Sequence, residues 1–309
     1  MARLGLGLAA VGRPAYITLG RERDLAGERS RAGLAARSHE LLDRAYAAGV
    51  RYVDAARSYG DAEAFLGSWL RARGHDDVFV ASKWGYTYVG GWRMDAPKHE
   101  VKSHDLATFD RQWAESRALL GDRLRLYQVH SVTPDSPLLA DEVLLRRLAG
   151  LRAEGVEVGA STSGPGQPEA IRRLLDVTVD GVRLLSSVQA TWNLLEPSAG
   201  AALAEAHAAG LRVVVKEGVA NGRLTPHAPS PARELVEVAE QHGVGIDAVA
   251  LAAALAQPWC DVVLSGAVTT AHLDANLRAA GLALDPEVLT GLAEPPAEYW
   301  ATRARLPWA

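Results

Sequence analysis

Eight apolar runs of strand length constrain the fold more than any other feature of the chain. They cover Leu4–Leu8, Arg51–Asp54, Val78–Lys83, Leu126–His130, Val156–Ser161, Leu185–Gln189, Leu211–Lys216 and Val262–Ser265. Apolar runs of this kind are typical of parallel strands that are covered by helices. Eight of them predict a closed (β/α)8 barrel of the TIM type, and a doubly wound open sheet is the alternative.

The segments between the runs have helical periodicity. Apolar residues recur at helical spacing between Asp61, which is placed to cap a helix, and Gly74, which is placed to end it. The segment 34–45 has one apolar face and is expected to be helical, and Gly49 is placed to end this helix. Alternation of strands and helices without a linker predicts one domain over residues 1–309.

Composition excludes several classes of protein. Acidic residues outnumber basic ones 37 to 33, which argues against a nucleic-acid partner. The apolar stretch at 248–256 is far too short to span a bilayer, so no membrane partner is expected. The single cysteine, Cys260, excludes an internal disulfide and a cysteine-based zinc cluster. The first twelve residues are better interpreted as a strand than as a signal peptide, and we expect a cytoplasmic protein.

Seven of the eight runs end in a polar residue. These residues are Asp54, Lys83, His130, Ser161, Gln189, Lys216 and Ser265. In a barrel the carboxyl ends of all strands surround one mouth, where such proteins build their sites. Two of the four lysines in the chain are among the seven. The sequence therefore predicts a functional site at the mouth.

Asp54, Tyr59, Lys83 and His130 form a chemically complete set for proton transfer to a carbonyl oxygen. A phenol titrates near pH 10 and is a poor acid at neutral pH. A nearby ammonium from Lys83 favours the phenolate, and Asp54 offsets the burial of that ammonium. His130 can donate a hydrogen bond to the tyrosine or to a substrate oxygen. Each residue alone has a simpler interpretation as a turn, rim or core group.

These residues lie in the stretches DAARSYGDAEAFLGSWL, VFVASKWG and LYQVHS, which closely resemble the aldo-keto reductase family in order and spacing. The resemblance continues through VGASTSG, VQATWNLLEP, VKEGVANGRLT and LSGAVTTAHLDANLRA. It implies a (β/α)8 barrel that binds NADPH at its mouth and reduces an aldehyde or ketone. It also implies that Tyr59 is the acid, that Asp54 and Lys83 tune it, and that His130 orients the carbonyl.

The same resemblance implies a set of cofactor-binding residues. They are Ser161, Thr162 and Gln189 at the nicotinamide carboxamide, Lys216, Glu217, Gly218, Asn221 and Gly222 along the pyrophosphate segment, and Gly266, Ala267, His272 and Asn276 at the adenosine end. Two departures matter. Lys216 aligns with a residue that is often aromatic, and His272 stands where Arg or Gln is frequent. NADP(H) is therefore the expected cofactor, with NAD(H) as the alternative.

The substrate is predicted only as a small-molecule carbonyl compound. Aromatic residues concentrate on the expected mouth loops, and we expect Trp84, Tyr86, Trp92 and Trp192 to line an apolar substrate pocket. The same aromatic residues could instead hold long loops in place. The sequence leaves open whether the protein is a monomer or a small homo-oligomer.

Rival interpretations remain. Gly5 and Gly7 match a dinucleotide-binding fingerprint, but no strand precedes them. His99 and His104 lack a clear partner pattern, so no metal site is predicted. Two other functions stay open: a Schiff-base lyase that uses Lys83 or Lys216, and an inactive regulatory subunit that binds a nicotinamide cofactor.

Overall fold

The computed structural model describes residues 3–25, 28–284 and 289–308, and its centre is a closed parallel barrel. The strands are β1 (Arg3–Gly7), β2 (Tyr52–Asp54), β3 (Phe79–Trp84), β6 (Leu124–Val132), β7 (Glu157–Thr162), β10 (Ser187–Thr191), β11 (Arg212–Lys216) and β12 (Val262–Ser265). They pair in the order β1-β12-β11-β10-β7-β6-β3-β2, and β1 also pairs with β2 to close the ring. Each of the eight predicted runs forms one strand, which confirms the predicted (β/α)8 barrel.

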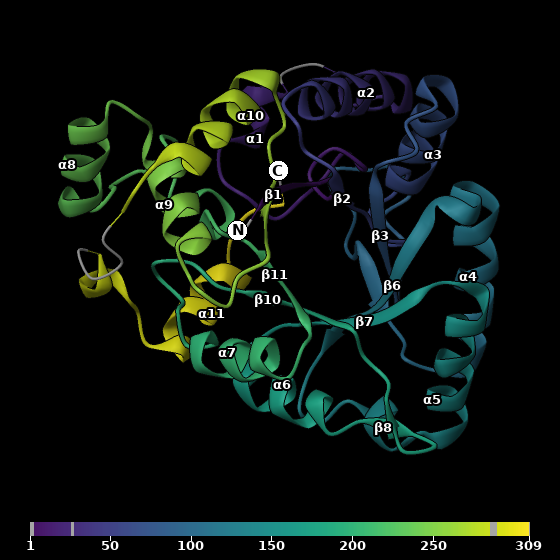
Figure 1. Cartoon of the computed structure of the whole chain (residues 1–309). Coiled ribbons are helices and arrows are strands. Elements are labelled where there is room, and N and C mark those ends of the chain that lie inside the picture. Colours follow the sequence, from purple (N-terminus) through teal and green to yellow (C-terminus); the bar gives the residue numbers. More distant parts are fainter. Residues whose placement is uncertain (1–2, 26–27, 285–288, 309) are drawn as a thin grey trace.

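Helices surround the barrel (Figure 1). The chain forms α1 (Arg21–Asp24), α2 (Arg31–Ala47), α3 (Ala62–Arg73), α4 (Leu106–Leu120), α5 (Glu142–Ala149), α6 (Gln167–Leu175), α7 (Gly200–Ala208), α8 (Arg233–His242), α9 (Ile246–Leu255), α10 (Thr270–Leu277) and α11 (Pro296–Ala304). Short 3-10 helices lie at Gly121–Arg123, Pro137–Ala140, Gly150–Glu154, Ala220–Gly222, Arg278–Gly281 and Thr290–Leu292. No helix of the described residues is long and apolar enough to cross a membrane.

Two small hairpins project from the barrel. β4 (Tyr86–Tyr88) and β5 (Glu100–Lys102) pair antiparallel directly after β3. β8 (Thr178–Val179) and β9 (Val182–Arg183) form the second hairpin. The first hairpin belongs to the mouth, because Tyr86 and Glu100 line the pocket described below.

The helix ends follow the sequence signals with one exception. α3 ends at Gly74, which has a φ of 67°. Asp61 precedes α3 as predicted, but its side chain makes no capping hydrogen bond and pairs with Arg31 at 2.9 Å. The capping expectation is wrong because the nearby guanidinium attracts the carboxylate. Ser30 caps α2 by accepting a hydrogen bond from the Gly33 amide at 3.0 Å.

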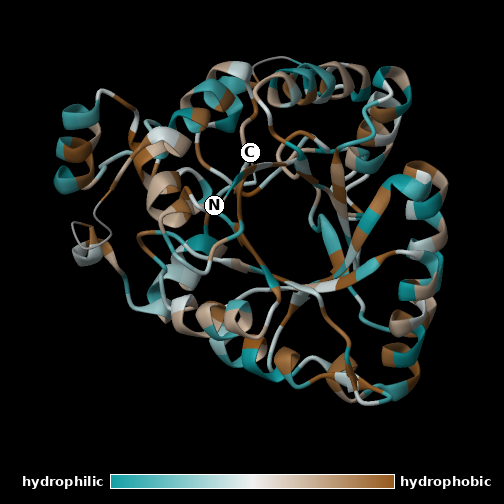
Figure 2. Cartoon of the chain, viewed as in Figure 1, coloured by the Kyte–Doolittle hydropathy of each residue, from teal (hydrophilic) through white to brown (hydrophobic). Residues whose placement is uncertain are grey.

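The core has two parts. Most helices around the barrel contain both hydrophobic and hydrophilic residues (Figure 2). The larger part lies between strands and helices. The smaller part lies inside the barrel and consists of Tyr52, Ala81, Leu126, Val214, Val262 and Leu264. A Cβ on Gly5 would lie 3.0 Å from the side chains of both Leu264 and Val262. Gly5 therefore serves close packing within strand β1, as expected, and not a dinucleotide-binding turn.

Candidate active site

A buried ion pair joins the ends of β2 and β3. The Lys83 ammonium donates to Asp54 Oδ1 and also to the Ala55 carbonyl at 3.0 Å. The other carboxylate oxygen, Asp54 Oδ2, accepts from Gln128 Nε2 at 3.2 Å and from Gln189 Nε2 at 3.0 Å. The Lys83 side chain is 0% exposed, so this pair is taken fully out of water. The two neutral amide donors at Oδ2 offset part of the cost of burying the charges.

Tyr59 lies next to this ion pair, in the turn that follows β2. Its hydroxyl is 3.4 Å from His130 Nε2, and the Lys83 ammonium nitrogen is 4.9 Å from the centroid of its ring. The Tyr59 and His130 rings meet edge to face with a centroid separation of 5.5 Å. The barrel thus brings together all four residues that the sequence analysis selected for proton transfer.

Burial and nearby charges determine whether Tyr59 is protonated at neutral pH. Burial raises the pKa of Tyr59 well above its ordinary value, and the carboxylates of Asp54, Glu100 and Glu217 raise it further, while Arg13 lowers it. The net shift is opposite to the one expected from Lys83 alone, because desolvation of the phenolate is the largest effect. Tyr59 therefore carries its proton at neutral pH.

His130 is neutral for a related reason. Burial lowers the pKa of His130 well below its ordinary value, and the positive charges of Lys83 and Lys216 lower it further. Its Nδ1 has no hydrogen-bond partner among the described residues. A neutral imidazole with Nε2 beside the phenol can exchange one hydrogen bond with Tyr59 or with a substrate oxygen, but it cannot contribute a positive charge.

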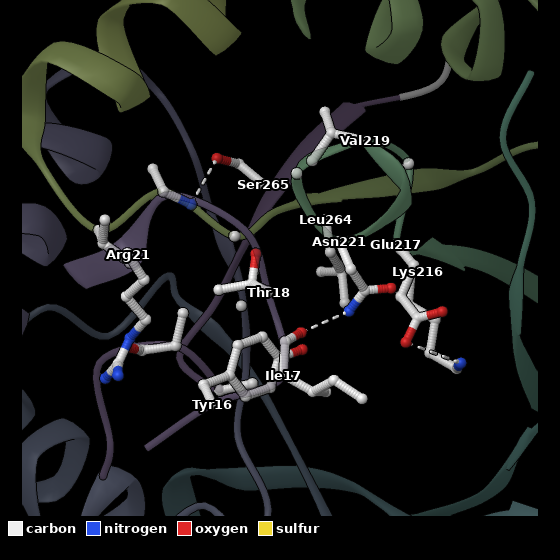
Figure 3. Close-up of a pocket in the computed structure, with 18 of the residues that line it drawn as sticks. Tyr16, Ile17, Thr18, Arg21, Lys216, Glu217, Val219, Asn221, Leu264 and Ser265 are labelled. Atoms are coloured by element: carbon white, nitrogen blue, oxygen red, sulfur yellow. Dashed lines mark hydrogen bonds and ion pairs between the residues drawn. The ribbon is translucent and has the colours of Figure 1, made fainter. Parts of the chain in front are cut away.

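Three of the four residues border a pocket of about 510 Å³ that extends over the barrel mouth. Asp54, Tyr59 and His130 line it, while Lys83 lies beneath the lining. The segment from Tyr16 to Leu19 borders the pocket on one side, and Asn221 joins this segment to the loop after β11 by donating to the Ile17 carbonyl at 2.9 Å (Figure 3). The pocket is therefore a groove between two connected chain segments.

Arg13 is a pocket residue that sequence reasoning missed. It is 2% exposed, and its Nη1 donates to the Ser58 carbonyl at 2.9 Å and to Glu100 Oε1 at 2.8 Å. Its guanidinium also lies 5.7 Å from the Tyr59 ring centroid and 5.1 Å from that of Trp308. The only signal in the sequence is its position in the loop directly after β1, which faces the mouth.

Arg303 is a second residue that sequence reasoning missed, and it joins α11 to the loop after β11. Its Nε lies 3.0 Å from Glu217 Oε1, and Glu217 Oε2 accepts from Thr191 at 2.9 Å. Burial opposes ionisation of Glu217, but the charges of Arg303 and Lys216 dominate and lower its pKa to about 2. Nothing in the sequence links position 303 to position 217, which are 86 residues apart.

Most of the predicted cofactor residues surround the same pocket. Its lining includes Gln189, Lys216, Glu217, Gly218, Asn221, Gly222, Gly266, Ala267, His272 and Asn276. Of the described residues in this segment, Ser163 lines the pocket, whereas Ser161 and Thr162 do not. Ser161 accepts instead from the Ser131 amide at 2.8 Å, which fixes the backbone after His130.

The loop after β11 has an unusual backbone. Glu217, Ala220, Asn221 and Gly222 all have positive φ, between 49° and 91°. Within the described part of the chain, the amides of Gly218 and Val219 donate to no carbonyl oxygen, and both residues line the pocket. Successive backbone amides in such conformations form concave sites for anions. This loop can therefore hold a phosphate group.

Only one of the four predicted substrate-pocket aromatics reaches the pocket. Tyr86 lines it and lies 5.0 Å from the His130 ring, centroid to centroid. Trp84 is buried against Phe109, and Trp192 is buried against Trp259. These two indoles fill the spaces between barrel and helices.

Trp92 is half-buried, and it donates to the Arg29 carbonyl at 2.9 Å instead of lining the pocket. The structure therefore does not bring Trp84, Trp92 and Trp192 to the substrate side. There the aromatic lining consists of Tyr16, Tyr59, Tyr86 and Trp308.

A neutral histidine and a protonated tyrosine lie above a buried Lys–Asp pair at the mouth of a (β/α)8 barrel, and they form a candidate site for proton transfer. The model of the Aldo/keto reductase family matches residues 25–294. The chain is 27% identical over 280 residues to aldo-keto reductase str7 of Strobilurus tenacellus, covering 80% of this chain and 77% of that protein. The protein thus belongs to the aldo/keto reductase family.

The fold agrees with this assignment. The holo form of aldo-keto reductase AKR11C1 from Bacillus halodurans superposes with a TM-score of 0.70 at 21% identity, over 95% of this chain and 92% of the other. Family membership supports NAD(P)H-dependent carbonyl oxidoreduction as the general class of activity.

Proposed function

We propose that this protein reduces an aldehyde or ketone to an alcohol with NADPH, and that Tyr59 supplies the proton. The observation that carries the proposal is the Tyr59 hydroxyl, 3.4 Å from His130 Nε2 in the mouth pocket and next to the buried Lys83–Asp54 pair. The lone cysteine Cys260 supports a cytoplasmic location, and we keep a monomer or small homo-oligomer as the expected state.

Tyr59 acts as the acid because burial keeps it protonated. As negative charge develops on the carbonyl oxygen, the phenolic proton moves to that oxygen and leaves a phenolate behind. Lys83 lies 4.9 Å from the ring centroid and stabilises this phenolate, while Asp54 holds Lys83 in position. The raised pKa keeps the proton on Tyr59 before the reaction, and the adjacent ammonium lowers the cost of losing it.

His130 orients the substrate. Since burial and two nearby lysines keep the imidazole neutral, its contribution is a hydrogen bond and not a charge. A carbonyl oxygen that contacts both Tyr59 and His130 Nε2 would be fixed in direction by two groups, one in the turn after β2 and one in β6. The aromatic rings of Tyr86 and Trp308 give this end of the pocket an apolar wall.

The groove fits a nicotinamide dinucleotide, which when bound supplies the hydride for the carbonyl carbon. Within the described residues, the amides of Gly218 and Val219 have no hydrogen-bond acceptor and suit its pyrophosphate, and Gln189 in β10 lines the pocket near Asp54. We propose that Lys216, Glu217, Asn221, Gly222, Gly266, Ala267, His272 and Asn276 complete the cofactor site. Ser161 and Thr162 support it from behind, through the backbone of Ser131 and Ser163.

The preference for NADPH depends on two opposed groups at the α10 end of the groove. His272 can donate a hydrogen bond to a 2′-phosphate. Asp24 Oδ1 lies 3.6 Å from His272 Nε2. The Asp24 carboxylate repels a 2′-phosphate and can accept a hydrogen bond from a 2′-hydroxyl. Asp24→Asn should therefore raise the ratio of NADPH affinity to NADH affinity, by about tenfold for one lost charge. An unchanged ratio would show that this carboxylate does not face the cofactor.

The test is a panel of aldehydes and ketones with NADPH and NADH, followed by the loss of reduced-cofactor absorbance over many turnovers. We expect carbonyl-dependent oxidation of the cofactor with at least one aromatic or apolar substrate. A protein that binds NADPH but gives no turnover with any member of the panel would instead be the inactive regulatory subunit.

One observation favours the Schiff-base lyase as second candidate. Burial lowers the pKa of Lys216 to about 8, which makes its amine more nucleophilic than that of an ordinary lysine. Against it, the Lys216 ammonium donates to Thr191 Oγ1 at 2.6 Å. Borohydride treatment with substrate and without cofactor distinguishes the two functions, because only a lyase would yield a substrate–lysine adduct.

A further inference from the structure

Two imidazoles and one carboxylate meet at the α10 end of the pocket. Asp24 ends α1, His227 lies in the loop after β11, and His272 belongs to α10, and all three line the pocket. His227 Nε2 lies 3.2 Å and His272 Nε2 lies 3.6 Å from Asp24 Oδ1. Together the three residues offer one ligand atom each, all within 4.8 Å of one another.

These separations match a tetrahedral metal site. Zinc binds histidine nitrogen and carboxylate oxygen at about 2.0–2.2 Å, so two ligands at a tetrahedral angle lie roughly 3.3 Å apart. The observed 3.2 and 3.6 Å fall close to this value before any rearrangement. Two histidines with one carboxylate, and a fourth position left to water, are a ligand set that zinc takes in proteins.

The convergence of both imidazoles on one oxygen is the second indication. A carboxylate has two oxygens, and two independent hydrogen bonds could use both of them. Here both Nε2 atoms approach the same oxygen, Oδ1, as they would around a shared cation. The rings themselves meet edge to face with centroids 5.8 Å apart, which leaves both Nε2 atoms free to point inward.

The ligands are held in place by their own backbones. The His272 amide donates to Thr269 Oγ1 at 3.1 Å in the first turn of α10, and the His227 amide donates to Thr225 Oγ1 at 3.2 Å. Gly20, with a φ of 82°, leaves room for the His227 ring, since a Cβ there would lie 2.4 Å from His227 Cγ. The three side chains are only 13–33% exposed, which limits their freedom before binding.

We propose that Asp24, His227 and His272 bind a divalent transition-metal ion of the zinc type. The ion ties the segment at α1 and the loop after β11 to α10, three segments that border the pocket and lie far apart in the chain. The sequence analysis predicted no metal site, because residues 24, 227 and 272 have no ligand spacing to detect. Metal binding needs neither substrate nor nicotinamide cofactor, but it shares Asp24 and His272 with the adenosine end of the proposed cofactor site.

The test titrates zinc into untagged, chelator-treated and dialysed protein, with calorimetry and thermal unfolding as readouts. We expect one zinc ion per chain and a melting temperature that rises and then saturates. Cobalt(II) in the same site should give the intense visible bands of tetrahedral coordination. Asp24→Asn and His272→Ala should each weaken zinc binding at least tenfold, and the exposed His242→Ala should leave it unchanged.

Several outcomes would overturn the proposal. These are no stoichiometric binding by the parent protein, equal affinity in the parent and the variants, or a cobalt–thiolate band that assigns the ion to Cys260. Asp24→Asn preserves the shape of the side chain, so it remains informative if His272→Ala does not fold. Cofactor affinities should be measured with chelator present, because His272 serves both proposals.

Discussion

Replacing Lys83 with Met removes the cation that compensates a buried carboxylate. The Lys83 side chain is 0% exposed and that of Asp54 is 3% exposed, so water cannot replace the lost charge. Breaking a buried ion pair from one side costs about 3–5 kcal/mol of stability. Because Gln128 and Gln189 still donate to Asp54 Oδ2, we expect a loss of about 3 kcal/mol at neutral pH, near the lower end.

The assay is urea unfolding of the parent, Lys83→Met, Asp54→Asn and the double variant at neutral pH. The double variant removes both charges, so it should be more stable than Lys83→Met alone. The reasoning is refuted if Lys83→Met unfolds at the same urea concentration as the parent, or if the two single losses simply add in the double variant.

Three further predictions concern the groove, and each has its own measurement. With chelator present, His272→Ala should lower the ratio of NADPH to NADH affinity about tenfold and His272→Arg should raise it; equal ratios would exclude this residue as the phosphate contact. Gly222→Ala should cost about 1–3 kcal/mol in urea unfolding, because φ is 91° there, whereas Gly281→Ala, with open space around it, should cost far less. The pKa of Lys216 is about 8 in the folded protein and about 10.4 in the unfolded chain. The contribution of Lys216 to the free energy of unfolding should therefore increase as pH rises between these values. Lys216→Met should abolish that increase. If the free energy of unfolding rose with pH as steeply in the variant as in the parent, the pKa assigned to Lys216 would be wrong.

The barrel was predictable because its strands are apolar over their whole length. Runs such as Val262–Ser265 are covered on both faces, and eight such strands with helices between them favoured a closed barrel over a doubly wound open sheet. The polar strand ends Asp54, Lys83 and His130 were predictable for the same reason, since a parallel barrel places all carboxyl ends at one mouth. Tyr59 follows one of these ends by only five residues.

The remainder of the site depends on loops and on the C-terminal helix. Arg303 reaches Glu217 from α11, and Arg13 reaches Glu100 across the β4–β5 hairpin, through contacts that no periodicity encodes. Trp84 and Trp192 are of a residue type that is expected in a substrate pocket, yet they are buried in the core. An aromatic residue near a strand end can point either into the mouth or toward a helix, and only the backbone geometry decides which.

The proton-donating role of Tyr59 is tested most directly by single-turnover reduction in Tyr59→Phe, with cofactor affinity measured on the same sample. The account predicts that NADPH binds with nearly the parent affinity, because the phenolic hydroxyl contacts His130 and not the predicted phosphate loop. It predicts that reduction of the bound carbonyl slows by about 10² or more, the usual loss for a positioned acid. A Tyr59→Phe protein that reduces its substrate at the parent rate would contradict it.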